Sequence, residues 1–248
     1  MTMPSAATGA GGSPPSSRAA GRPALAHAAP FAAWVLLMAV SGEPAGWKYA
    51  LRSAVVLAMF LALRPWRWYA APRPGNLPLA LACGCLVFLA WVAPETPWFG
   101  RTFPAVQDAY LRFGTDLRRI GQLPAPLAAT PYAPEICGWP MALVRLLGSG
   151  LVIAAVEEFF WRGFLYRFLI APAFTRVDPG TFAAAAFLAV AAVFGLEHDR
   201  WLAGVLAGLA YGAVFVRTRD IWAAVVAHAA TNLLLGLYVL STGAYRFW

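Results

Sequence analysis

Charged residues are scarce in this chain. Only 12% of its 248 residues are charged, whereas 60% are hydrophobic, and the mean hydropathy is +0.63. A soluble domain of this length needs more polar surface to stay dispersed. Several apolar runs also reach the roughly 17–25 residues with which a helix crosses a ~30 Å hydrocarbon core. The low charge therefore excludes an ordinary soluble protein and predicts an integral membrane protein.

Cysteine is scarce as well, and the basic residues form no cluster. Cys83 and Cys85 lie two positions apart in an apolar run, so on a helix they point in different directions, and Cys137 is distant. We interpret all three as small apolar residues, because no further ligands stand nearby. The net charge of +8 comes from single basic residues at loops and segment ends. This pattern favours membrane lipid as a partner and argues against nucleic acid.

The first residues lack the composition of a core. They are rich in Gly, Ser, Pro and Ala, so we expect a disordered tail over 1–23 and a membrane-embedded domain over 24–248. Arg18 and Arg22 come late for a signal peptide, and no clean cleavage pattern follows them. We therefore expect the next apolar stretch to remain as the first membrane helix.

The apolar runs predict an all-α fold, a polytopic transmembrane helix bundle with about seven spans (six to eight). The expected spans are 24–40, 49–63, 77–92, 142–170, 182–196, 201–216 and 221–240. Between the third and fourth spans, the proline-rich segment 94–140 is predicted as a loop that contains an amphipathic surface helix over 106–120. In the sixth span, the small residues Gly204, Gly208 and Gly212 predict close packing of a neighbouring helix.

Arginines in the short loops predict the topology. With seven spans, four sets fall on one side of the membrane: Arg18 and Arg22; Arg64, Arg67 and Arg73; Arg167 and Arg176; Arg217 and Arg219. We therefore expect a cytoplasmic N-terminus. The abundance of Ala, Pro, Gly and Arg is typical of a bacterial chain, so the predicted location is the cell inner membrane.

The fourth span contains three ionisable residues, which are costly inside a membrane. Glu158 and Arg162 are one helical turn apart and can pair. Glu157 lies about 100° around the helix from Glu158, so it can face a different direction, free of the arginine. A purely structural Glu–Arg pair would explain Glu158 and Arg162 but would leave Glu157 unexplained.

Two later spans carry histidines on helical faces with a second notable residue. His198 follows Phe194 by four positions, and Asn232 follows His228 by four. A buried His–Asn pair alone is more often structural. Together with two membrane glutamates, these residues predict a functional site.

The four polar groups suffice for peptide hydrolysis. Glu157 and His198 could hold and deprotonate a water, and His228 and Asn232 could donate hydrogen bonds to the oxyanion of a tetrahedral intermediate. The same carboxylates and imidazoles could instead bind zinc, but the sequence has no HExxH motif. We therefore favour a glutamate-dependent enzyme without a cofactor, and leave a zinc-dependent metalloendopeptidase open.

In order, spacing and membrane setting, three motifs resemble the signatures of the CPBP family. They are Glu157-Glu158-xxx-Arg162, Phe194-xxx-His198 and His228-xxx-Asn232. This family of CAAX proteases and bacteriocin-processing proteins, also called Abi, includes the type II CAAX prenyl endopeptidases. The resemblance implies an intramembrane endopeptidase with its catalytic core at 142–240, in which Glu158 and Arg162 support the site and Phe194 contacts the substrate.

The resemblance also suggests partners. The substrate would be a membrane-associated or lipidated protein or peptide. The stretch after His198 is similar to the subgroup that accompanies exosortase sorting systems, which implies such a system as a partner. Two other classes stay open: a non-enzymatic scaffold or bacteriocin-immunity-type protein that keeps the motifs for packing, and a small transporter, although no inverted repeat is visible.

Overall fold

The computed structural model describes residues 17–124 and 130–248, and every regular element in these ranges is helical. Six helices are long and apolar enough to cross a membrane: Arg22–Val40, Gly46–Trp68, Pro74–Glu95, Trp139–Ile170, Trp201–Thr218 and Ile221–Thr242. This confirms the predicted all-α polytopic helix bundle. The predicted fifth span corresponds to α10 (Ala184–Leu196), which has only 13 residues.

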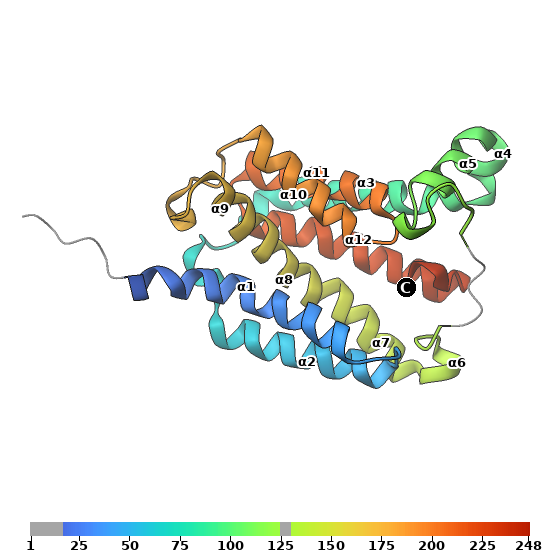
Figure 1. Cartoon of the computed structure of the whole chain (residues 1–248), viewed down its shortest axis with the longest axis horizontal. Helices are drawn as coiled ribbons and strands as arrows, with labels where there is room; N and C mark the ends of the chain where they lie inside the picture. The colour runs from blue at the N-terminus through green and yellow to red at the C-terminus, as the bar shows by residue number, and fades with distance from the viewer. Residues whose placement is uncertain (1–16, 125–129) are drawn as a thin grey trace, which may run out of the picture.

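The fourth of these helices divides the bundle (Figure 1). It comprises α7 (Trp139–Leu147), α8 (Ala154–Glu158) and α9 (Arg167–Ile170), joined by the π-helical segments η5 (Gly148–Ile153) and η6 (Phe159–Tyr166). On one side lie α1 (Ser17–Val40) and α2 (Gly46–Leu63). On the other lie α3 (Leu77–Val92), α10, α11 (Trp201–Thr218) and α12 (Ile221–Thr242). The long helix is therefore the wall shared by both halves.

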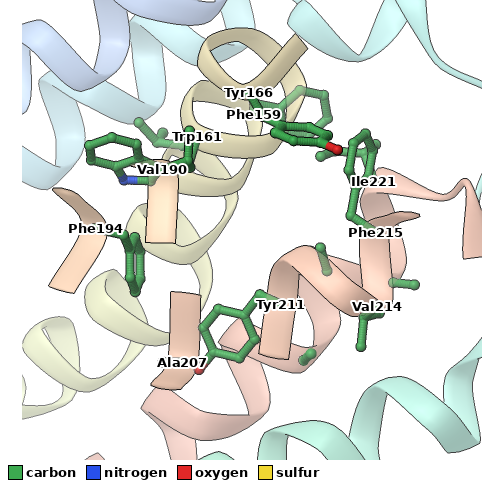
Figure 2. Packing of buried hydrophobic residues seen from close by; sticks show 14 of the residues in the cluster. Phe159, Trp161, Tyr166, Val190, Phe194, Ala207, Tyr211, Val214, Phe215 and Ile221 are labelled. Carbon is green, nitrogen blue, oxygen red and sulfur yellow. The ribbon is translucent and has the colours of Figure 1, made fainter. Parts of the chain in front are cut away.

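Aromatic and aliphatic side chains from both halves form the main core around this helix. Phe159 and Trp161 of η6 contribute to it, as do Phe194 of α10, Tyr211 of α11 and Ile221 of α12. Figure 2 shows part of this cluster. Its members are buried, so the polar residues of the long helix have little access to lipid or water except through a cavity.

The glycine row of α11 packs as predicted. A Cβ added at Gly204, Gly208 or Gly212 would lie within 2.9 Å of a residue of α10, respectively Gly195, Ala191 and Phe187. The missing side chains allow the two backbones to approach closely at Gly204 and Gly208, and they make room for the Phe187 ring at Gly212. This approach fixes α10 against α11.

Shorter helices connect the spans. They are α4 (Pro97–Thr102), α5 (Pro104–Phe113) and α6 (Pro134–Cys137), with 3-10 turns at Pro65–Trp68, Pro74–Asn76, Ala93–Glu95, Leu117–Arg119, Phe174–Arg176 and Tyr245–Phe247. The single amphipathic helix predicted over 106–120 was wrong in its second half, because α5 ends at Phe113. There the chain turns through Asp116 (φ 31°), whose backbone N–H donates to the Asp199 carbonyl at 2.6 Å. A contact distant in sequence thus fixes the turn that follows the helix.

The expected tail over 1–23 is described only in part. Residues 1–16 lie outside the described residues, as does the segment 125–129 of the predicted loop. Residues 17–23 form the first turns of α1, so helix begins earlier than the composition indicated.

The segments that carry the four arginine sets meet at one end of the bundle. Tyr69 Oη lies 3.0 Å from His27 Nε2 and 3.4 Å from Arg167 Nη1. Asp220, the N-cap of α12, accepts from the backbone N–H of Arg73 at 3.1 Å and from Asn76 Nδ2 at 3.0 Å. The opposite end holds the chain's C-terminus, α4 and α5.

Candidate active site

The two glutamates of the long helix lie on a short α-helical stretch between two π-helical segments. Glu157 and Glu158 end α8, with η5 before them and η6 after. π-helical turns change the direction in which neighbouring side chains point, and they occur often at functional sites. The sequence carries no signal for them that hydrophobic periodicity could detect.

Glu158 is at the centre of a buried charge network. Its Oε1 accepts from Arg162 Nη1 at 2.8 Å and lies 2.9 Å from His228 Nδ1. Arg162 Nη2 also donates to the carbonyl of Gly208 at 3.0 Å. Glu158 is 0% exposed and Arg162 1%. The predicted Glu158–Arg162 pair is therefore present, and it connects α8 and η6 with α11 and α12.

Glu157 points in a different direction from Glu158, as its position on the helix predicted, and approaches His228 from the other side. Its Oε2 lies 3.9 Å from His228 Nε2, and its side chain is 12% exposed. His228 thus stands between the two glutamates, with one ring nitrogen toward each. Because a carboxylate only accepts, Nδ1 of His228 must donate to an ionised Glu158.

His228 is held by more than its ion pairs. Its ring stacks on Tyr211, with centroids 4.8 Å apart and planes 18° apart. Tyr211 is fixed in turn by a 2.8 Å hydrogen bond from its hydroxyl to Thr231 Oγ1. Asn232, one turn after His228, donates to the carbonyl of Ser149 in η5 at 3.0 Å. Its amide therefore lies against the long helix.

His198 sits just beyond α10, on the linker to α11. At 1.5 Å per residue, a helix of 13 residues is about 20 Å long, short of a ~30 Å hydrocarbon core. The short helix thus leaves His198 within the bundle. Its Nδ1 lies 2.8 Å from the Phe194 carbonyl. A carbonyl accepts only, so Nδ1 carries the proton and Nε2 of a neutral ring is free to accept.

Phe194 lies between the two histidines. Its ring centroid is 4.9 Å from that of His198 and 5.7 Å from that of His228. The Arg162 guanidinium carbon lies 4.6 Å from the Phe194 ring centroid. The side chain is only 1% exposed. Phe194 also lines the cavity that contains both histidines, so its predicted contact with substrate stays a prediction.

Backbone hydrogen bonds from residues outside the membrane helices hold the linker that carries His198. Besides the Asp116–Asp199 backbone hydrogen bond, Leu202 N–H donates to the Gly114 carbonyl at 3.2 Å. A hydrogen bond from Arg118 lowers the pKa of Asp116, so its carboxylate stays charged. Nearby, Glu95 pairs with both Arg200 and Arg246. The α5 segment and the C-terminus therefore position this histidine.

One cavity of about 320 Å³ collects the predicted polar groups. Glu157, His198, His228 and Asn232 all line it, whereas Glu158 and Arg162 lie behind its wall. A water takes up about 30 Å³ in the liquid, so there is room for a water and part of a peptide. In the described part of the chain, no three His, Cys, Asp or Glu side chains come close enough to hold a metal ion.

Sequence reasoning missed two arginines of the same cavity. Arg52 of α2 and Arg145 of α7 line it together with Tyr49 and Trp248. A lone arginine in an apolar run is a detectable signal. Both lie near a span end, however, where a basic side chain is ordinarily explained by reaching for the interface.

A polytopic helix bundle with glutamates, histidines and an asparagine around one buried cavity defines a membrane-embedded site for acid–base chemistry. Residues 139–234 match the family model of Rce1-like type II CAAX prenyl endopeptidases. Over that segment the chain is similar to this group of the CPBP family, and the similarity supports intramembrane endopeptidase activity at the level of the family. No curated protein and no solved structure matches the chain.

Proposed function

We propose that this protein is a glutamate-dependent intramembrane endopeptidase that hydrolyses a peptide bond in a membrane-associated or lipidated protein or peptide. The observation that carries the proposal is the convergence of Glu157, His198, His228 and Asn232 on one cavity. The matched family model supports the same class of reaction.

In the proposed reaction, Glu157 is the general base. Water binds between the Glu157 carboxylate and Nε2 of His198, which the Phe194 carbonyl leaves free to accept. Glu157 takes one proton as the water oxygen attacks the scissile carbonyl carbon. When the C–N bond breaks, the same carboxyl returns that proton to the leaving nitrogen, and the products are a carboxylic acid and an amine.

His228 and Asn232 are the proposed donors to the oxyanion. Nδ1 of His228 already donates to Glu158, so Nε2 donates only if the ring is a doubly protonated imidazolium. Two glutamates, Arg162 and such an imidazolium then sum to zero charge, which a buried site favours. Asn232 supplies the second donor through the amide hydrogen that Ser149 does not occupy.

The proposed orientation follows from the ends of the bundle. The arginine-rich segments meet at one end, and the positive-inside rule places that end in the cytoplasm with the N-terminus. The cavity, which Phe247 and Trp248 also line, lies toward the other end. In an inner membrane, the site would therefore open on the non-cytoplasmic side, where an exosortase system is the proposed partner.

The experiment that tests this is cleavage in liposomes of a fluorescence-quenched peptide that carries a prenylated cysteine. We expect Glu157→Gln to lower kcat at least about 100-fold, the lower range for removal of a general base. His228→Ala should lower it as well. Asp108→Asn, which changes an exposed carboxylate on α5, serves as the matched control and should cleave normally.

Equal cleavage by wild type and Glu157→Gln would overturn the proposal. A folded Glu157→Gln protein, with an unchanged unfolding midpoint and no cleavage, would exclude a scaffold that keeps these residues only for packing.

A further inference from the structure

The hairpin of α4 and α5 carries large apolar side chains that the other described residues leave exposed. Trp98 of α4 is 60% exposed, and Phe103, in the bend between the two helices, is 46% exposed. On α5, Val106 is 57% exposed and Phe113 53%. We call these four residues the apolar hairpin face. An exposed apolar patch on a folded protein marks a surface that contacts lipid or a partner.

The charged residues of α5 lie on a different side of the helix. At 100° per residue, Phe113 lies within about 20° of Val106, whereas Asp108 and Arg112 lie about 200° and 240° around the helix from it. These two charged residues form an exposed ion pair at 2.9 Å. Tyr110, on a third side, is buried against the protein. The helix therefore has one side for the protein, one for water and one apolar side without a described partner.

The connections of the hairpin place it where membrane spans begin and end. α4 begins two residues after Glu95, the last residue of the third span, so at about 3.8 Å per residue its start lies within about 8 Å of that end. Gln107 Nε2 in α5 donates to the carbonyl of Pro94, in the same span, at 2.7 Å. After α5, the Gly114 carbonyl accepts from the N–H of Leu202, near the start of α11, at 3.2 Å.

This placement favours lipid over a soluble partner. The headgroup layer adds about 5–7 Å to each side of the hydrocarbon core, so α4 begins at headgroup level. Tryptophan is enriched at this level, and amphipathic helices bury their apolar side at the boundary between headgroups and acyl chains. Arg101, exposed on α4, adds a positive charge that suits a lipid phosphate. Figure 1 shows both helices at the end of the bundle where the chain's C-terminus lies.

We propose that the apolar hairpin face lies in the headgroup–acyl boundary of the leaflet at this end of the bundle, with phospholipid as its partner. The turn that follows α5 carries this contact to the candidate active site, because the backbone N–H of Asp116 donates to the Asp199 carbonyl at 2.6 Å. Lipid thereby anchors, from outside the bundle, the linker that carries His198. This goes beyond the proposed function, since it assigns a lipid-binding surface that takes no part in hydrolysis.

The accessibility of spin labels tests the position of the face. Labels are attached at Val106→Cys, at Asp108→Cys on the charged side of the same helix, and at Leu86→Cys, which is 66% exposed on the membrane-spanning α3. The protein, in nanodiscs of phosphatidylcholine and phosphatidylglycerol, also carries the changes Cys83→Ser, Cys85→Ser and Cys137→Ser. Collisions with oxygen, which concentrates in lipid, are compared with collisions with a water-soluble nickel chelate.

The ratio of oxygen to nickel collisions at Val106→Cys should exceed that at Asp108→Cys severalfold and approach that at Leu86→Cys. Equal ratios at the two α5 positions would place the face in water and overturn the proposal. Loss of collisions with both reagents at Val106→Cys would mean that protein covers the face, and would overturn it as well. The two α5 positions are exposed, so labelling leaves the packing contacts of the helix in place.

Hydrogen exchange tests the link to His198. The double variant Phe103→Asn, Val106→Asn removes apolar side chains from the face, so the backbone amides of residues 199–202 should exchange severalfold faster than in the unchanged protein. Asp108→Asn, an exposed change on the same helix, is the matched control and should leave their exchange as it is. Unchanged exchange in the double variant would overturn the anchoring role. Neither measurement requires cleavage, so failure of the proposed peptidase function would leave both results standing.

Discussion

Two arginines of one helix show two ways to keep a cation inside this bundle. Arg162 pairs with Glu158 at 2.8 Å and donates to the Gly208 carbonyl, so its charge is compensated within the protein. The guanidinium of Arg145, nearer the start of the same long helix, lies over aromatic rings and forms no ion pair with a described residue. The first arrangement compensates the charge with a carboxylate and a carbonyl, whereas the second relies on aromatic faces.

The two arginines also differ in their place relative to the cavity. Arg162 lies behind the cavity wall and holds Glu158, which orients His228. Arg145 lines the cavity itself. If this comparison is right, substitution of Arg162 should cost far more stability than substitution of Arg145.

The largest effect is expected at Arg162. Arg162→Ala leaves the carboxylate of Glu158 buried beside only His228, and removal of one partner of a buried ion pair typically costs about 3–5 kcal/mol. Reversible unfolding by SDS in mixed micelles measures this loss. The control is Arg112→Ala, which breaks an exposed i,i+4 pair with Asp108 and should cost about 0.5 kcal/mol or less.

A loss at Arg162 as small as that at Arg112 would contradict the comparison. The double variant Glu158→Gln, Arg162→Met sharpens it, because replacing both partners removes the unpaired charge. We expect the double variant to be more stable than Arg162→Ala.

A smaller effect is expected at Gly208, whose backbone carbonyl accepts a hydrogen bond from Arg162. A Cβ at this position would lie 2.9 Å from Ala191 Cα, so α10 and α11 must separate. Gly208→Ala should cost about 1–3 kcal/mol, the usual range for overpacking. Gly75→Ala is the control, since no atom lies within 4 Å of its added Cβ. Equal unfolding midpoints for the two variants would show that the helices yield freely.

Much of the fold could be predicted because lipid imposes a simple rule on sequence. Apolar runs of sufficient length become helices, and the glycine row of α11 indicated its close neighbour. The turn at Asp116 could not be predicted, because a hydrogen bond to Asp199, far along the chain, fixes it. The π-helical segments around α8 were equally invisible to periodicity.

The Glu158–Arg162 pair could be predicted from the sequence, whereas the approach of Arg52 and Arg145 to one ring could not. Glu158 and Arg162 are one turn apart, so their pairing follows from helix geometry. Arg52 and Arg145 lie on separate helices, and only the packing of α2 against α7 brings them to one ring. No local spacing predicts such a meeting.

The smallest effect on the free energy of unfolding is expected for Arg145, and it distinguishes this arginine from Arg162. Arg145→Gln removes cation–π contacts, which are worth up to about 2 kcal/mol when desolvated, but it also removes a cation that lacks a carboxylate partner among the described residues. The two changes oppose each other, so without ligand the free energy of unfolding should change by less than about 1 kcal/mol in either direction. The same SDS titration measures it, with Arg162→Ala alongside. A large loss at Arg145 would mean that the aromatic rings alone compensate this cation. A loss far smaller than that of Arg162→Ala would show that the bundle depends on the arginine paired with a carboxylate and not on the one surrounded by aromatic rings.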